Sequence, residues 1–86
     1  MARFLGVHDG FVGATKEQAS AVHDAYLVIE DEEGVHFERA WLDPEAGKFF
    51  CLSTALSKEA VMRIHERTGH ATTEIYEIRV EISPWQ

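Results

Sequence analysis

Histidine and cysteine side chains are the groups in this chain best suited to chemistry, because imidazole nitrogen and thiolate sulfur bind transition metals. The 86 residues include five histidines and a single cysteine, Cys51. Together with carboxylates, these donors suit nickel, zinc, copper or iron. The sequence contains no CxxC pair and no HxxxH pair, so it has no zinc-finger pattern. The residue types therefore suit a metal site without being evidence of one, and their spacing does not define one.

Each candidate also has a simpler structural interpretation. Cys51 lies in the middle of a predicted strand, where a small buried hydrophobic residue is common. His65 lies on an apolar helix stripe and can be a core-edge residue, while His36 on a strand can simply face solvent. His23 is predicted on the exposed side of a helix, and His70 follows a helix end, where it could cap carbonyl groups.

The acidic composition narrows the range of partners. The formal net charge is −7 with histidine counted as neutral, and such a surface repels phosphates, which disfavours nucleic acid. No apolar run approaches the roughly 20 residues of a membrane helix, and the N-terminus lacks the apolar core of a signal peptide. One cysteine excludes an internal disulfide, which fits a reducing compartment. We therefore expect a cytoplasmic protein with no nucleic-acid or membrane partner.

Hydrophobic periodicity predicts one domain, residues 1–86, with two helices and four strands. A capping box at Thr15 begins the first helix and Gly34 ends it, while Ser57 begins the second helix and Gly69 ends it. The predicted strands are residues 3–8, 35–42, 48–54 and 74–82. The order strand, helix, strand, strand, helix, strand predicts an α+β, ferredoxin-like βαββαβ sandwich, a four-stranded antiparallel sheet with two helices on one face.

The face of the sheet on which each residue lies decides which histidines can meet. The predicted cross-strand pairs of the central hairpin are Asp43–Lys48, Ala40–Cys51 and Glu38–Ser53. The open face is predicted to carry His36, Glu38, Ala40, Phe49, Cys51 and Ser53, with His8 as a further candidate. The face under the helices is predicted to carry Phe37, Trp41, Phe50 and Leu52.

The topology separates the histidines between two ends of the sheet. His8 is expected at one end, near His65 and His70 at the end of the second helix, whereas His36 is expected at the other. A two-fold homodimer that stacks open faces brings opposite ends together. We therefore expect a metal site between subunits.

The chain also resembles a known family in several motifs. They are Gly34-Val35-His36-Phe37, Ala40-Trp41-Leu42-Asp43-Pro44, Phe50-Cys51-Leu52-Ser53, Glu59-Ala60-Val61 and Ile64-His65-Glu66-Arg67-Thr68-Gly69-His70. This is the bacterial family of small nickel-binding or nickel-responsive domains, and the likeness covers nearly the whole chain. It implies a ferredoxin-like homodimer with nickel as cofactor and with His8, His36, Cys51 and His65 as metal residues. The chain departs from the family at Leu56, where relatives tend to carry proline, and at Tyr26, where they often carry an acid.

Three hypotheses follow for the function. The first is a homodimer that binds nickel, with zinc or copper able to take its place, for sequestration or sensing. It predicts that protonation of the histidines below about pH 6 releases the metal. The second is a dimeric ferredoxin-like enzyme for a small molecule, of the cofactor-free oxygenase or isomerase type, with His65 beside Cys51 in a pocket. The third is an interaction module whose open face only dimerises.

Overall fold

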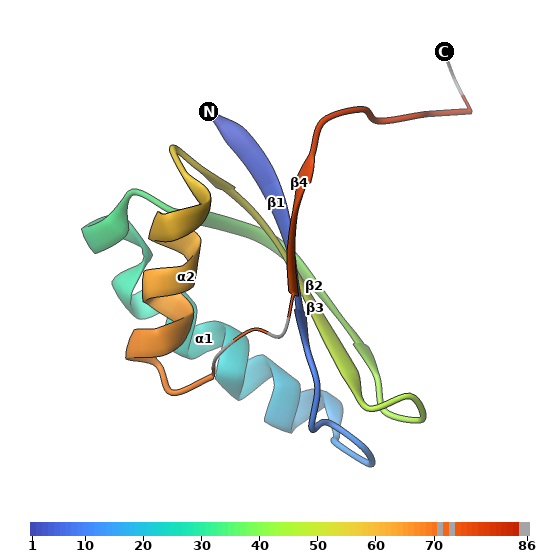
Figure 1. Cartoon of the computed structure of the whole chain (residues 1–86). Helices are drawn as coiled ribbons and strands as arrows, with labels where there is room; N and C mark the ends of the chain where they lie inside the picture. Colours follow the sequence, from blue (N-terminus) through green and yellow to red (C-terminus); the bar gives the residue numbers. More distant parts are fainter. Residues whose placement is uncertain (71, 73, 85–86) are drawn as a thin grey trace.

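The computed structural model describes residues 1–70, 72 and 74–84, and there it contains the predicted elements in the predicted order. They are β1 (Ala2–His8), α1 (Lys16–Glu33), β2 (His36–Asp43), β3 (Lys48–Ala55), α2 (Lys58–Arg67) and β4 (Glu74–Ile78). The strands form one antiparallel sheet in the order β2-β3-β1-β4, and both helices cover the same face of it (Figure 1). The predicted ferredoxin-like βαββαβ fold is confirmed.

Capping side chains set the helix boundaries. The Thr15 hydroxyl accepts the backbone N–H of Gln18 at 3.1 Å, and the Thr15 N–H donates to the Gln18 side chain at 2.8 Å. Gly34 follows α1 in the left-handed conformation, with a φ of 66° that glycine adopts without steric cost. At the start of α2, the Ala60 N–H donates to the Ser57 hydroxyl at 3.2 Å. The helix starts predicted from the sequence are confirmed.

A β-bulge in β2 changes the register of the central hairpin. The predicted pairs Asp43–Lys48 and Ala40–Cys51 are present, but Phe37 rather than Glu38 lies opposite Ser53. The shift falls between Phe37 and Arg39, where one extra residue is accommodated in β2. As a result, the odd-numbered Phe37 is buried under the helices, whereas after the bulge the even-numbered residues of β2 face the helices.

The predicted faces of β3 are the wrong way round. Phe49, Cys51 and Ser53 are buried under the helices, whereas Phe50 and Leu52 are only half-buried on the other side of the sheet. Trp41 pairs with Phe50, and 47% of its surface is exposed. The prediction placed the larger side chains under the helices, yet the helices bring large groups of their own to that face. Smaller strand residues such as Cys51 fill the space that remains.

The prediction that His8 lies on the open face is also wrong. β1 is a central strand, and His8 lies directly opposite Phe49 on β3, so the two side chains share the covered face. His8 is 2% exposed. Its proximity to the end of α2 is confirmed, because the ring centroids of His8 and His65 are 4.7 Å apart.

Strand β4 ends at Ile78 rather than at Ile82. Its neighbour β1 begins at Ala2, so the last pair between them is Arg3–Ile78. Val80 and Ile82 continue the strand-like alternation, yet they are 80% and 90% exposed. A hydrophobic alternation therefore overestimates a strand whose partner has ended.

The core lies between the covered face and the two helices. Its buried hydrophobic residues are Phe4, Ala19, Tyr26, Val35, Phe37, Phe49, Cys51, Ala55, Ala60, Val61 and Ile64. Within the described residues, neither helix is both long enough and apolar enough to cross a membrane.

Candidate metal centre

Three side chains that can bind a metal converge beneath the helices. His8 ends β1, Cys51 lies in the middle of β3, and His65 lies in the last turn of α2. One potential ligand atom from each residue lies within 4.8 Å of the other two. Their exposed fractions are 2%, 1% and 0%, respectively. Because water does not reach this cluster, its polar atoms need partners from the protein or a bound ion.

The sheet forms the floor of the cluster. Gly6 lies opposite Cys51 in the β1–β3 pairing, and His8 follows two residues later on the same face. A Cβ atom at Gly6 would lie 3.6 Å from Cε1 and 3.8 Å from Nε2 of His65. Glycine at this position therefore leaves open a space the size of a methyl group beside Nε2 of His65.

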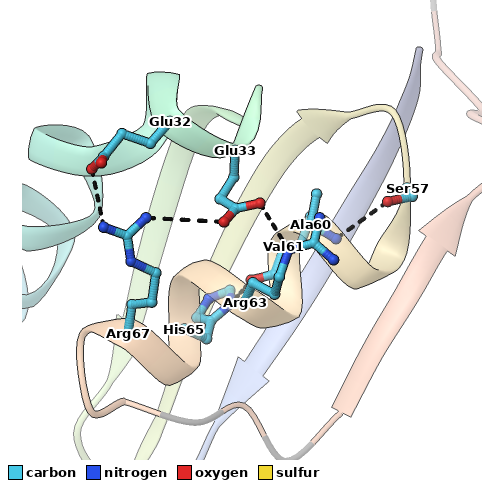
Figure 2. Close-up of polar contacts among 8 residues, drawn as sticks. All are labelled: Glu32, Glu33, Ser57, Ala60, Val61, Arg63, His65 and Arg67. Carbon is cyan, nitrogen blue, oxygen red and sulfur yellow. Dashed lines mark hydrogen bonds and ion pairs between the residues drawn. The ribbon is translucent and has the colours of Figure 1, made fainter.

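Ion pairs between the helices help to hold α2 in place above the sheet (Figure 2). Arg63 donates to Glu33 at 2.8 Å, and Arg67 donates to Glu32 at 3.1 Å. These side chains are at least partly exposed, and pairs of this kind contribute only about 0–1 kcal/mol each. Most of the packing energy of α2 therefore comes from its buried stripe, to which His65 belongs.

The protonation state of His65 leaves one nitrogen available as a ligand. Nδ1 lies 2.8 Å from the Val61 carbonyl oxygen (Figure 2). A carbonyl only accepts, so Nδ1 carries the proton and Nε2 carries a lone pair. Nε2 is buried, and among the described residues it has no hydrogen-bond partner. Burial, with a smaller contribution from His8, lowers the pKa of His65 to about 4, so the ring is neutral at pH 7.

Cys51 is a neutral thiol in the metal-free protein. Burial raises its pKa to about 12, because the surroundings do not solvate a thiolate. This environment does not activate Cys51 as a nucleophile, which would need a lowered pKa and access to solvent. A bound cation is the change that would favour the thiolate here, since metal coordination deprotonates a thiol.

Aromatic rings enclose the two histidines. The Tyr26 ring lies 4.8 Å from that of His65 and 6.1 Å from that of His8. Phe49 lies 5.8 Å from His8, and Phe37 lies 5.8 Å from His65, measured between ring centroids. These rings exclude water and lower the local dielectric constant, which strengthens any interaction between a cation and a thiolate.

The chain matches known proteins in its fold and over most of its length. Residues 4–78 match the family described as "Nickel responsive protein SCO4226-like". The chain belongs to this family. A solved structure, the crystal structure of SCO4226 from Streptomyces coelicolor A3(2), is 47% identical and has a TM-score of 0.91, covering 94% of this chain and 100% of that one. No curated protein matches.

His36, the fourth metal residue implied by the resemblance to the SCO4226-like family, lies apart from the other three. Its side chain is 71% exposed, and its Nδ1 lies 3.7 Å from Glu30 Oε1. It pairs with Thr54 at one end of β3, whereas His8 pairs with Phe49 near the other end. The structure therefore groups His8, Cys51 and His65 and leaves His36 outside the group.

Stacked open faces do not bring these three ligands to a partner subunit. His8, Cys51 and His65 all lie beneath the helices of one chain, on the face away from the expected dimer contact. The expected site between subunits required Cys51 to lie on the open face. Because Cys51 lies on the covered face, this expectation is wrong for the group of His8, Cys51 and His65.

Tyr26 is a member of the site that the sequence analysis did not identify. It is 0% exposed and touches both imidazole rings. Burial, followed by the proximity of Cys51, raises the pKa of its phenol above the ordinary value, so the group is neutral. One signal in the sequence pointed to it: Tyr26 lies at helical spacing from Ala19 and Val22, on the apolar side of α1.

The donors at this site fit a transition metal. Two imidazoles and one thiol are the borderline and soft ligands of nickel, zinc and copper. The lone pair on Nε2 of His65 and the space beside Gly6 lie next to each other. His8, Cys51 and His65 are the residues that would hold the ion, and the ion would supply the positive charge that the buried thiolate requires.

Proposed function

We propose that this chain is a nickel-binding protein whose metal is held within one subunit by His8, Cys51 and His65. The observation that carries the proposal is the convergence of three buried donors within 4.8 Å, one of them His65 with an unpaired and deprotonated Nε2. A hydrogen bond from the other ring nitrogen to a backbone carbonyl, such as the one from Nδ1 to Val61, is the usual way to orient a ligating histidine.

The choice of nickel comes from the family, and the choice of a transition metal comes from the donors. Affinity order favours copper over nickel at most nitrogen sites, and zinc also accepts this ligand set. Membership of a nickel-responsive family supports nickel as the physiological ion. Among the described residues, three protein donors converge at this position.

The proposed role is sequestration or sensing. A bound ion would pair with the free Nε2 of His65 and with the Cys51 thiolate. Because the unfolded chain has no such preformed site, metal binding stabilises the folded state. Such coupling turns metal concentration into a change in protein stability and dynamics. A reduced Cys51 thiol is required, which supports the assignment to the cytoplasm.

We propose further that the chain forms a homodimer through the open face of its sheet. Trp41 and Tyr76 are 47% and 51% exposed there, and Leu5, Phe50 and Leu52 are only half-buried. Contiguous apolar surface of this kind commonly marks a protein contact. The helix-covered metal site remains complete in each subunit, so dimerisation is not needed for binding.

Titration of tag-free, chelator-stripped protein with nickel tests the proposed site. We expect saturable binding of one ion per chain and a thiolate-to-nickel charge-transfer band in the near ultraviolet. The Cys51→Ser variant should lose the band and bind more weakly, while His36→Ala, a histidine outside the cluster, should keep both. Unsaturable binding, or equal loss in both variants, contradicts the proposal.

A further inference from the structure

The proposed metal site has no direct opening to solvent, because His8, Cys51 and His65 are each at most 2% exposed. We infer that the ion reaches it through a surface pocket beside the β1–α1 loop, where His70 receives the ion and the Phe11 ring separates pocket from site. The inference rests on the proposed function and adds to it the route and the residues that set the rate.

The pocket combines a metal ligand with a wall of the buried site. It has a volume of about 550 Å³, and its lining includes Asp9 and Phe11 from the loop, Val22 from α1 and His70 from the segment after α2. Asp9 forms an ion pair with Lys48. His70 is therefore the lining residue whose donor resembles those of the buried site, and imidazole suits nickel better than a carboxylate does.

His70 is connected to the metal site through one aromatic ring. Its backbone N–H donates to the His65 carbonyl at 3.0 Å, which fixes the start of the segment after α2. Its ring lies 6.4 Å from that of Tyr26, and Tyr26 lies 4.8 Å from His65. The side chain is half-buried, so it is accessible from the pocket and adjacent to the shell of the site.

Phe11 contributes to both the pocket and the enclosure of the site. Its ring lies 5.1 Å from Phe49 and 6.4 Å from His8, and the same ring lines the pocket. The loop that carries it is tied to the β2–β3 hairpin, because the Phe11 N–H donates to the Gly47 carbonyl at 3.1 Å. Rotation of the partly buried ring, with the loop backbone held, is the smallest movement that opens the way to His8.

A second pocket provides the rival route and therefore the matched control. It has a volume of about 660 Å³, lies between α1 and β2, and is lined by His23 and Phe49 among others. The His23 ring lies 6.2 Å from that of Phe37, and Phe49, whose ring lies 5.8 Å from that of His8, also lines this pocket, so this route reaches the shell of the site as well. Ions that enter there would depend on His23 and not on His70.

Stopped-flow mixing of chelator-stripped protein with nickel chloride, and of nickel-loaded protein with excess chelator, tests the route. The variants are His70→Gln, Phe11→Ala and Phe11→Leu, with His23→Gln as the control. Because a route changes both rates without changing equilibrium, His70→Gln should slow association and dissociation by at least about fivefold each. Phe11→Ala should accelerate both by a similar factor, and Phe11→Leu, which keeps most of the wall, should do so less.

The equilibrium dissociation constant separates the outcomes. It should stay within about twofold of the wild-type value in all four variants, because affinity is the ratio of the two rates. Normal rates in His70→Gln, slowed rates in His23→Gln, or a weaker affinity in His70→Gln that comes from faster dissociation would each overturn the route and leave the proposed function intact. An absence of saturable nickel binding by the wild-type protein would refute both.

Discussion

The two faces of the sheet place the same residue type in opposite environments. On the covered face, His8 and His65 are 2% and 0% exposed and meet Cys51 within an aromatic enclosure. On the open side, the His36 side chain is 71% exposed and its nearest acid is Glu30. Successive residues of a strand point to opposite faces of the sheet. Burial, rather than residue type, therefore decides which histidine is a good ligand.

The polar groups of the two faces are satisfied in different ways. On the open face, Glu38 accepts from Arg3 at 3.2 Å and from Thr54 at 3.0 Å, within reach of water. On the covered face, Nε2 of His65 has no partner among the described residues, and the Cys51 thiol is kept neutral by burial. A cation is therefore of little consequence to the first group and would complete the second.

The largest difference in nickel affinity is expected between two variants that each remove one histidine, one from each face of the sheet. His65→Gln removes a proposed ligand from the covered cluster, so nickel affinity should fall by at least about 100-fold, more than the usual cost of losing a residue that only hydrogen-bonds to a ligand. His36→Gln should change affinity by less than about twofold. Calorimetric titration of both variants, after circular dichroism has shown that they are folded, measures the difference.

A similar loss of affinity in the two variants would contradict the assignment of His65, and not His36, to the metal site. It would mean that His36 and His65 act on one ion, which a single chain with the described geometry does not allow. His36 would then have to reach the metal of a second subunit.

The stability of the metal-free protein should fall as the pH decreases from about 6.5 to 4. Burial lowers the folded-state pKa of His65 to about 4, below the unfolded value near 6.5, so the unfolded chain takes up the proton first. The full stability is present above pH 6.5, and roughly 2–3 kcal/mol is lost on the way to pH 4. Urea unfolding across this range, compared with His65→Gln, isolates the contribution, because the variant should lack that part of the slope.

Nickel affinity should rise about tenfold for each pH unit between pH 7 and 8.5, because one proton leaves with each ion bound. That proton comes from Cys51, whose pKa of about 12 keeps the thiol protonated until the metal arrives. His65 is already neutral there, so it should not release a proton, and its protonation should expel the metal nearer pH 4 than the pH 6 expected from the sequence. The Cys51→Ser variant should have a flatter profile, and an unchanged slope in it would assign the proton to another group.

Local sequence rules predicted the elements of this fold well, because each helix boundary depends on nearby residues. Thr15, Gly34 and Ser57 act within three or four residues of themselves, and all were predicted at the correct ends of helices. The end of β4 was missed since it depends on where β1 begins, which is 76 residues away along the chain, from Ala2 to Ile78.

The candidate site was only partly predictable because it depends on which face of the sheet the helices cover. His8, Cys51 and His65 were chosen, but Cys51 and His8 were expected on the open face. A period-two pattern states which residues share a face and does not state which face is covered. The bulge after Phe37 also makes the faces of β2 harder to predict, because it reverses the alternation of side chains within the strand.

The smallest expected change in the stability of the single chain comes from the open face. Trp41→Glu places a charge where two subunits are proposed to meet, so the dimer should dissociate in analytical ultracentrifugation, because the charge would lose its hydration on association. The free energy of unfolding of the monomer should change by no more than about 1 kcal/mol, since nearly half of Trp41 is already exposed.

Val80→Glu is the matched control for this test. Val80 is 80% exposed and lies beyond the end of β4, outside the paired part of the sheet. The Val80→Glu substitution should leave both the dimer and the free energy of unfolding of the monomer unchanged. If Trp41→Glu stays dimeric while Val80→Glu dissociates, the contact lies on the segment after β4 and the open face has another use. Nickel affinity should be the same in both variants, because the three donors that converge among the described residues all lie on the covered face of one subunit.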